Sequence, residues 1–291
     1  MTDSESDSRS AVRNSPDMSL IITVVNPRQR IKRSCEQVLS DIAEVFSFCS
    51  SAKSDLAFFP ELYTTGYQMS RAKFVEYTIL YEKEKLNERI ADLADRFKVA
   101  ILYGYGEYDS QSEKVSNCAR FYDPKTKLDF VHSRDDYSTS NSVFNRGKKQ
   151  PPMFTWKHGA TVAFGICLET SKLDEVCDQF RGRGGGGGGV DLLFSLSTRS
   201  NTLLPQPRFL PHPTHSMFFL HNYYNEQGAD KCLTAEVNLM KLARFKRNDL
   251  DIERKPTKMS ASVKFMPGLK NPPENKKQSK KPKKRKTTWN F

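Results

Sequence analysis

The chain has 291 residues, enough for one large domain with a substantial core and short appendages. Its formal charge of +12 is concentrated at one end, because 13 of the 46 basic residues but only one of the 34 acidic residues lie between Arg254 and Phe291. The other 253 residues carry no net charge, because their 33 basic and 33 acidic residues balance. The folded part therefore gives no reason to expect a polyanionic partner. The Ser-, Asp- and Arg-rich start, without an apolar stretch, excludes a secretory signal, and no apolar run reaches membrane-spanning length.

The cysteines and histidines indicate free thiols and no bound metal. The six cysteines show no CxxC pairing, which suits a reducing compartment. His158, His212, His215 and His221 show no ligand spacing with acidic residues, so we expect neither a metal nor a cofactor. Together with the absence of a signal or membrane span, this predicts a cytoplasmic protein, with the nucleus as an alternative location.

Apolar periodicity predicts an alternation of strands and helices after a disordered leader over residues 1–18. The expected elements, in chain order, are a strand over 20–25, a helix over 32–49, a strand over 56–59, a helix over 80–97, a strand over 99–103 and two further strands that turn at 123–127. This order is typical of a layered α/β domain.

The second half is less regular. We expect a helix over 169–180, then a flexible poly-Gly insertion over 182–189, and strands over 190–196 and 217–224. An Arg-Gly stretch can contact RNA, but a single short one is better interpreted as a linker. The Pro-containing basic tail over 254–291 is expected to be disordered.

Two of the apolar strands end on chemically active side chains. The run from Leu56 to Phe59 stops at Pro60 and is followed by Glu61, and the run from Thr161 to Ile166 is followed by Cys167, with Glu169 beyond it. A carboxylate and a thiol at strand ends suggest nucleophilic catalysis with a general base.

The segments around these residues resemble the nitrilase (carbon–nitrogen hydrolase) superfamily, and most closely its small-carboxamide amidase branch. The similar segments, which run from about Ser19 to about Arg254, are 59–61 with 66–67, 100–107, 116–119, 122–124, 165–169 and 235–239. The resemblance implies a four-layer αββα sandwich over residues 19–253, with part of the C-terminal half missing near Gly228. Members of this family commonly dimerise by packing one sandwich against the other, so the resemblance also implies a homodimer.

The same resemblance implies residue roles. Cys167 matches the family nucleophile, which forms a thioester that water hydrolyses, and Glu61 matches the general base. The family lysine, which stabilises charge on the substrate oxygen, falls on His132, and a second acid falls on Ser140. An imidazole is mostly neutral at pH 7, and Arg134 lies on the same strand face and is the other candidate for this charge.

Each of these residues also has a structural interpretation. Cys167 can be a small buried side chain, Glu61 an ion-pair partner or an acid at a helix N-terminus, Glu169 a helix cap, and His132 a buried structural histidine. The leading hypothesis is hydrolysis of a small carboxamide, in nitrogen-compound metabolism, with weakened activity because the lysine is missing. The alternative is a catalytically inactive relative that acts as a binding or regulatory protein.

The tail carries a separate pattern. Lys280 to Lys286 resembles a single-cluster nuclear import signal that an adaptor would bind, and it can equally be a solvated charge run. A weaker third hypothesis is a nucleic-acid-associated protein whose binding would be salt-sensitive and lost with residues 254–291. A fault in the coding sequence over 184–232 would also explain a poly-Gly run beside a shortened segment.

Overall fold

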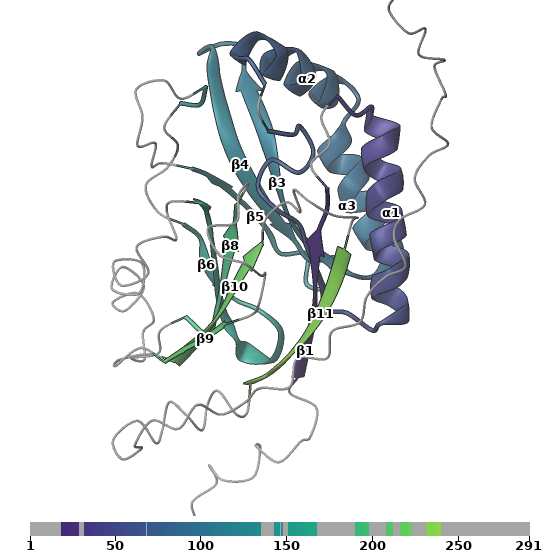
Figure 1. Cartoon of the computed structure of the whole chain (residues 1–291), viewed down its shortest axis with the longest axis vertical. Coiled ribbons are helices and arrows are strands. Elements are labelled where there is room, and N and C mark those ends of the chain that lie inside the picture. Colours follow the sequence, from purple (N-terminus) through teal and green to yellow (C-terminus); the bar gives the residue numbers. More distant parts are fainter. Residues whose placement is uncertain are drawn as a thin grey trace, which may run out of the picture.

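The chain folds into two β-sheets that pack face to face, with helices on the outer face of the first sheet (Figure 1). The computed structural model describes residues 19–28, 32–67, 69–134, 143–145, 147, 151–167, 190–197, 208–211, 216–222 and 231–239. The first sheet has the order β11-β1-β2-β3-β4-β5. Its strands are β1 (Ser19–Asn26), β2 (Leu56–Phe58), β3 (Ala100–Asp109), β4 (Lys114–Tyr122), β5 (Asp129–Ser133) and β11 (Lys231–Asn238).

The second sheet has the order β6-β7-β8-β10-β9. Its strands are β6 (Met153–Thr155), β7 (Thr161–Ile166), β8 (Leu192–Leu196), β9 (Arg208–Pro211) and β10 (Ser216–Asn222), with the short 3-10 turn η1 (Lys157–Gly159) between β6 and β7. Strands β7, β8 and β10 are parallel, while β6 and β9 are antiparallel edge strands. The predicted strand over 217–224 is confirmed as β10, whereas β9 was not predicted.

Helix α1 (Cys35–Ser51) connects β1 to β2, and its sequence specifies where it begins. The Ser34 hydroxyl accepts from the Gln37 backbone N–H, and the Gln37 side chain accepts from the Ser34 N–H, which forms a capping box. The residues at helical spacing that were predicted to face the sheet are buried; they are Val38, Leu39, Ile42, Val45 and Phe46.

The connection from β2 to β3 differs from the prediction. A single helix over 80–97 was expected, but the structure has α2 (Arg71–Lys83) and α3 (Leu86–Phe97). Lys85 adopts φ 52°, a left-handed conformation that no helix continues through, so the predicted helix is broken there. The prediction also missed the start of α2, where the Ser70 side chain caps the helix.

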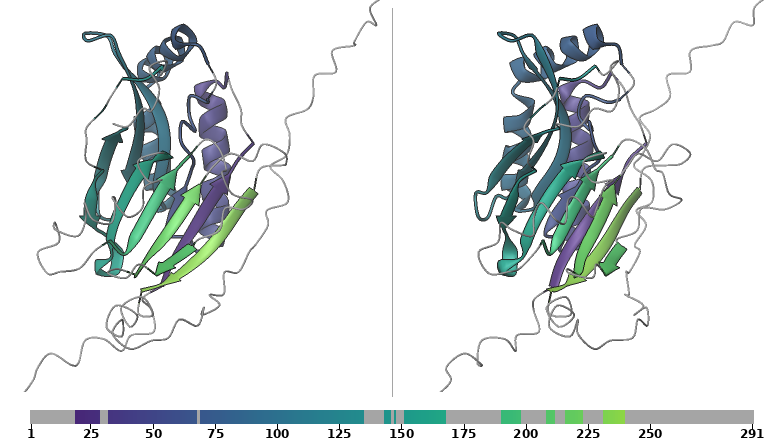
Figure 2. Two further views of the ribbon diagram at one scale, coloured as in Figure 1. Left: turned by 60° about the vertical axis from the view of Figure 1, so that its left-hand side comes forward. Right: turned by 90° about the vertical axis from the view of Figure 1, so that its left-hand side faces the viewer.

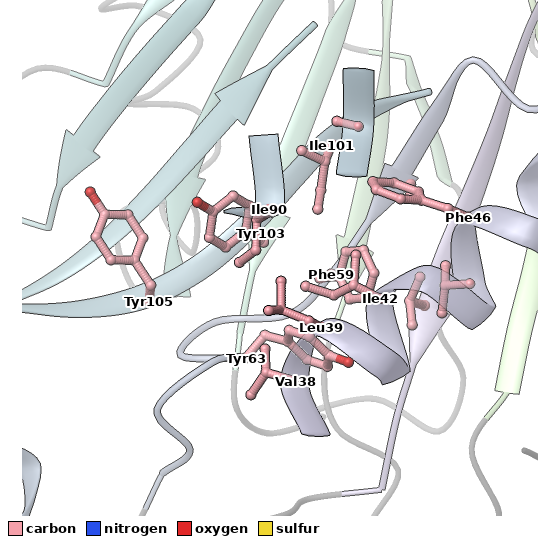
Figure 3. Close-up of a cluster of buried hydrophobic side chains, with 14 of the residues drawn as sticks. Val38, Leu39, Ile42, Phe46, Phe59, Tyr63, Ile90, Ile101, Tyr103 and Tyr105 are labelled. Carbon is pink, nitrogen blue, oxygen red and sulfur yellow. The ribbon is translucent and has the colours of Figure 1, made fainter. Parts of the chain in front are cut away.

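The three helices and the first sheet enclose one apolar cluster (Figure 3). It joins side chains of α1, of α3 and of β3 with Phe59 and Tyr63, which follow β2. Burial of a side chain such as Phe59 contributes about 1.5–3 kcal/mol, so this cluster holds the helices on the sheet and keeps the segment after β2 in place.

A second apolar core lies between the two sheets, whose strands lie in front of the helices in the views of Figure 2. The Phe58 ring of β2 meets the Phe194 ring of β8 edge-to-face at 5.1 Å. Trp156 meets Phe121 of β4 at 5.5 Å, and its indole N–H donates to Asp123 Oδ2. Asp123 also begins the predicted turn between β4 and β5, which is confirmed.

The predicted α/β class is therefore confirmed, with a helix layer and two sheet layers in the described part of the chain. The helix expected over 169–180 lies outside the described residues. The leader over 1–18, the poly-Gly insertion, the shortened link at Gly228 and the basic tail lie outside them as well. No helix of the described residues is long and apolar enough to cross a membrane.

Gly104 on β3 allows the segment after β2 to approach, and its replacement is a first test of the fold. A Cβ at this position would lie 2.4 Å from the Leu62 backbone nitrogen and 2.7 Å from the Glu61 Cα. We expect Gly104→Ala to lower the free energy of unfolding by about 1–3 kcal/mol, measured by urea denaturation. Gly159→Ala, at φ 75° with open space around it, serves as the control for backbone strain alone. Wild-type stability of Gly104→Ala would contradict the close approach.

Candidate active site

Glu61 is positioned by hydrogen bonds that continue along β3 after β2 has ended. The Phe59 N–H donates to the Leu102 carbonyl at 2.8 Å, and the Gly104 N–H donates to the Pro60 carbonyl at 3.1 Å. These bonds fix the backbone on both sides of Pro60, and Glu61 is 2% exposed. The carboxylate is therefore buried at the carboxyl end of a parallel strand, where α/β sheets commonly present functional groups.

Two donors meet one oxygen of this carboxylate. Asn117 Nδ2 donates to Glu61 Oε1 at 2.7 Å, and Arg134 Nη1 donates to the same oxygen at 3.1 Å. The side chains of Arg134 and Glu61 are 10% and 2% exposed, so this is a buried ion pair. An opposite charge at this distance favours the ionised carboxylate, which is the form that accepts a proton.

The strand ladder explains why Asn117 and Arg134 converge. Cys118 pairs with Ser133 and Ala119 with His132, so one step further along the ladder Arg134 lies opposite Asn117. The Arg134 N–H indeed donates to the Asn117 carbonyl at 2.9 Å. Because side chains alternate along a strand, Asn117 and Arg134 share the face that turns toward the second sheet.

His132 lies on this same face but in different surroundings. It is 2% exposed, and its ring meets the Phe164 ring of β7 edge-on, with 6.3 Å between the centroids. The sequence predicted that His132 takes the place of the family lysine. The structure puts His132 between the sheets, while the contact with Glu61 is made by Arg134 two residues further on.

Cys167 follows β7 directly in an unfavourable backbone conformation. Its φ is 54°, in the left-handed region that side chains other than glycine rarely adopt. The side chain is partly buried against the core between the sheets, and the Ser197 hydroxyl donates to Cys167 Sγ at 3.9 Å. Ser197 follows β8, which runs parallel to β7, so both groups lie at the carboxyl ends of neighbouring strands. Such strain is often found at functional sites.

Contacts across the core show that β5 and β7 advance in the same direction. The Phe130 ring of β5 stacks on Phe154 at 4.3 Å, and Phe154 is the partner of Val162 on β7. Two residues further along each strand, His132 meets Phe164. Two residues beyond His132 is Arg134, which directly follows β5, and two residues beyond Phe164 is Ile166, where β7 ends.

Cys167 therefore comes to the same end of the sandwich as Arg134, and Arg134 contacts Glu61. The structure thus brings Glu61, Asn117 and Arg134 into direct contact and places Cys167 at their end of the two sheets. Ser140 and Glu169 lie outside the described residues.

The other thiols differ from Cys167 in their surroundings. Burial raises the pKa of Cys35 to about 12 and that of Cys49 to about 11, and it also raises the pKa of Cys118. A nearby carboxylate, Glu84, adds to the effect at Cys35. Since the thiolate is the nucleophile, the raised pKa disfavours reaction of these three thiols near neutral pH. Cys177 lies outside the described residues.

Metal ligands do not gather in the described residues, since no group of three or more His, Cys, Asp or Glu is placed to hold an ion there. His158 lies exposed in η1, and the backbone of His221 is part of β10. His212 and His215 lie outside the described residues.

Sequence reasoning gave no role to two residues of this site. Asn117 was part of a segment with family resemblance, but its role depends on the pairing of β4 with β5. The alternation of buried side chains along β4 was the available signal, because Asn117 lies in phase with Ala119 and Phe121 of the core. Ser197 follows the predicted strand over 190–196, in the same way as Cys167 follows its strand.

The described part of the chain is a layered α/β protein, with helices packed on the first of two sheets and with a carboxylate and a thiol at one end of the sandwich. The model of the family described as carbon–nitrogen hydrolase matches residues 22–172, just over half of the chain. The chain belongs to this family.

Solved structures with a similar fold include amidases. An amidase from Nesterenkonia sp. AN1, a double mutant in complex with acrylamide, has 12% sequence identity and a TM-score of 0.60, with 81% of this chain and 97% of that chain covered. A mutant of the same amidase with the acetamide moiety of fluoroacetamide added covalently at its active site cysteine has 15% identity and a TM-score of 0.55, covering 76% of this chain and 84% of that chain. At such identities the likeness concerns the fold.

The chain spans about a third of the glutamine-dependent NAD+ synthetase from Acinetobacter baumannii, solved in complex with ADP. The identity is 15% and the TM-score 0.49, with 64% of this chain and 33% of that chain covered. A search of curated proteins by sequence found no match.

Proposed function

We propose that this protein hydrolyses the carbon–nitrogen bond of a small carboxamide through a thioester on Cys167. The observation that carries the proposal is the buried Glu61, held by Arg134 and Asn117, at the end of the sandwich where Cys167 follows β7. Membership of the carbon–nitrogen hydrolase family and the fold shared with amidases support the reaction class and a small-molecule substrate.

The proposed reaction has two halves. Glu61 accepts the thiol proton as Cys167 Sγ attacks the carbonyl carbon. The tetrahedral intermediate then expels ammonia, whose nitrogen takes this proton from Glu61, to leave the thioester and the ionised Glu61. Water next attacks the thioester carbon while Glu61 accepts its proton. The carbon–sulfur bond then breaks, which releases the carboxylic acid, and the leaving thiolate takes the proton back from Glu61 to restore the thiol.

The charge on the substrate oxygen needs a fixed donor, and two residues are candidates. We assign it to Arg134, because a guanidinium remains charged at every physiological pH and this one already lies beside Glu61. The role predicted for His132 stays a prediction. Arg134 lies two residues beyond the position of the family lysine, and its guanidinium is longer and planar, so weaker turnover is expected than with the lysine.

Thiol labelling tests the proposal without a known substrate. The full chain is treated with iodoacetamide between pH 6 and 8, and each cysteine is followed by mass spectrometry. We expect Cys167 to react first and to slow by about tenfold or more in Glu61→Gln, because its base is lost. Glu76→Gln, an exposed glutamate on α2, is the matched control and should change nothing.

Two results would count against the hydrolase. Cys167 would react no faster than the buried thiols, or Glu61→Gln would leave its rate unchanged although thermal melting shows a folded protein. Either result would favour the alternative, a carbon–nitrogen hydrolase fold that acts as a binding or regulatory protein.

Two predicted partnerships are kept as proposals, a homodimer and an import adaptor that binds Lys280 to Lys286. The tail lies outside the described residues. Deletion of residues 254–291, followed by cell fractionation and by measurement of molar mass in solution, would test both.

A further inference from the structure

A cavity of about 220 Å³ lies beside β3, where this strand runs on past the end of β2. Pairing of β2 with β3 ends at Phe58 and Leu102, and the last bond from the following segment is from the Thr64 N–H to the Gly104 carbonyl at 3.3 Å. Beyond that point the cavity takes up the space beside β3. It is lined by β3 residues 105–108, by Thr64, and by residues of α2 and α3.

The floor of the cavity is buried and largely aromatic. Tyr81 and Tyr105 are each 6% exposed and Leu86 is 2% exposed, and the half-buried Tyr108 adds a third ring. Tyr81 is fixed by a hydrogen bond from its hydroxyl to the Arg33 carbonyl at 2.7 Å. The Tyr81 ring is therefore held in place rather than free to close the space.

The rim of the cavity is acidic. Glu82, Glu88 and Glu107 line it and are exposed, while none of the lining residues is Lys or Arg. The Cys118 thiol donates to Glu107 Oε2 at 3.4 Å, which restrains that carboxylate. Three carboxylates around one small opening produce a negative potential, which attracts cations.

The helix ends do not reverse this potential. The carboxyl end of α2, at Glu82, adds partial negative charge, and the amino end of α3 adds partial positive charge. Glu88 lies in the first turn of α3 and offsets that positive end.

These carboxylates are not arranged for a metal ion, since the described residues hold no group of three or more metal-ligating side chains close enough together. A larger cation with an apolar part fits the aromatic floor, because ammonium groups also bind the faces of aromatic rings. We propose that this cavity binds a small organic cation, an ammonium group among the three carboxylates with its apolar part against the tyrosine rings.

The site is separate from the candidate active site, because Glu61, Asn117, Arg134 and Cys167 do not line the cavity. The proposal therefore does not depend on the hydrolase proposal. A free amine and a protein lysine carry the same headgroup, and the experiment below distinguishes them.

Calorimetric titration of the full chain at pH 7.5 tests the site with benzylamine, which is protonated there, and with benzyl alcohol, its uncharged analogue. We expect benzylamine to bind and benzyl alcohol to bind about two- to fivefold more weakly, as for loss of an exposed ion pair. The double variant Glu82→Gln/Glu107→Gln should weaken benzylamine by about fivefold or more, and Cys167→Ala should not.

The control Glu44→Gln/Glu76→Gln removes the same charge from exposed positions elsewhere and should bind like the wild type. Three results would overturn the proposal. Benzylamine would not bind, benzyl alcohol would bind as tightly as benzylamine, or the control would weaken binding as much as the double variant does. Nα-acetyl-lysine amide serves as the third probe. Tighter binding of this probe assigns the ligand to a protein lysine, and tighter binding of benzylamine assigns it to a free amine.

Discussion

Replacement of Cys167 with Ala is expected to abolish the release of ammonia from small carboxamides. No other described thiol lies at the Glu61 end of the sandwich with a strained backbone, and burial raises the pKa of Cys35, Cys49 and Cys118. Loss of a catalytic nucleophile typically costs on the order of 10⁴-fold or more in turnover. The measurement is ammonia release from a series of aliphatic amides of increasing chain length, which would also show how large an acyl group the site accepts.

The control for this experiment is Cys35→Ala, which removes a buried thiol from the first residue of α1. It should retain activity to the extent that the protein stays folded. When the wild-type reaction is stopped early, the intact mass of the protein should show an added acyl group, and peptide mass mapping should locate it on Cys167. Turnover that persists in Cys167→Ala would rule out the thioester route, and absence of any turnover in the wild type would favour the binding or regulatory protein.

Arg134→Met should destabilise the protein strongly. It leaves the Glu61 carboxylate buried at 2% exposure without its counter-charge, and removal of one partner of a buried ion pair costs about 3–5 kcal/mol. Urea denaturation measures this loss. The matched control is Arg89→Met, because Arg89 pairs with Glu36, whose side chain is 74% exposed, and exposed pairs contribute only about 0–1 kcal/mol.

The double variant Glu61→Gln/Arg134→Met separates the pair from the rest of the site. Without the buried charge it should be more stable than Arg134→Met alone, which gives a coupling energy between the two side chains. If Arg134→Met costs no more than Arg89→Met, the ion pair is not the main support of Glu61. Among variants that stay folded, a larger loss of turnover in Arg134→Lys than in His132→Asn would assign the oxyanion donor to Arg134.

The sequence was sufficient to predict that Glu61 and Cys167 follow strands, because a short apolar run and its abrupt end are local properties. It was also sufficient for α1, where the capping residue and the apolar spacing agree. The sequence did not predict the break at Lys85 between α2 and α3, because the spacing of apolar residues does not show that one residue between two helices is left-handed.

The contact between Arg134 and Glu61 could not be read from one sequence for another reason. Matching to the family pattern aligns residues by position, and this gave the lysine role to His132. Spatial neighbours are set by the pairing of β4 with β5, which brings Arg134 opposite Asn117, and by the close approach of Glu61 at Gly104. Which residue of β4 lies opposite which residue of β5 depends on both strands together, so the apolar pattern of one strand does not show it.

The antiparallel pairing of β1 with β11 has a consequence for synthesis of the protein. Ser19 pairs with Asn238 and Asn26 with Lys231, so β1, the first described strand, acquires one of its two neighbours only when β11, the last described strand, has been synthesised. Until then β1 presents an open edge, and such edges promote association between chains. Contacts across so much sequence also slow folding. A chain that stops before residue 231 would keep Glu61 and Cys167 but would leave the first sheet with an uncovered strand at its border.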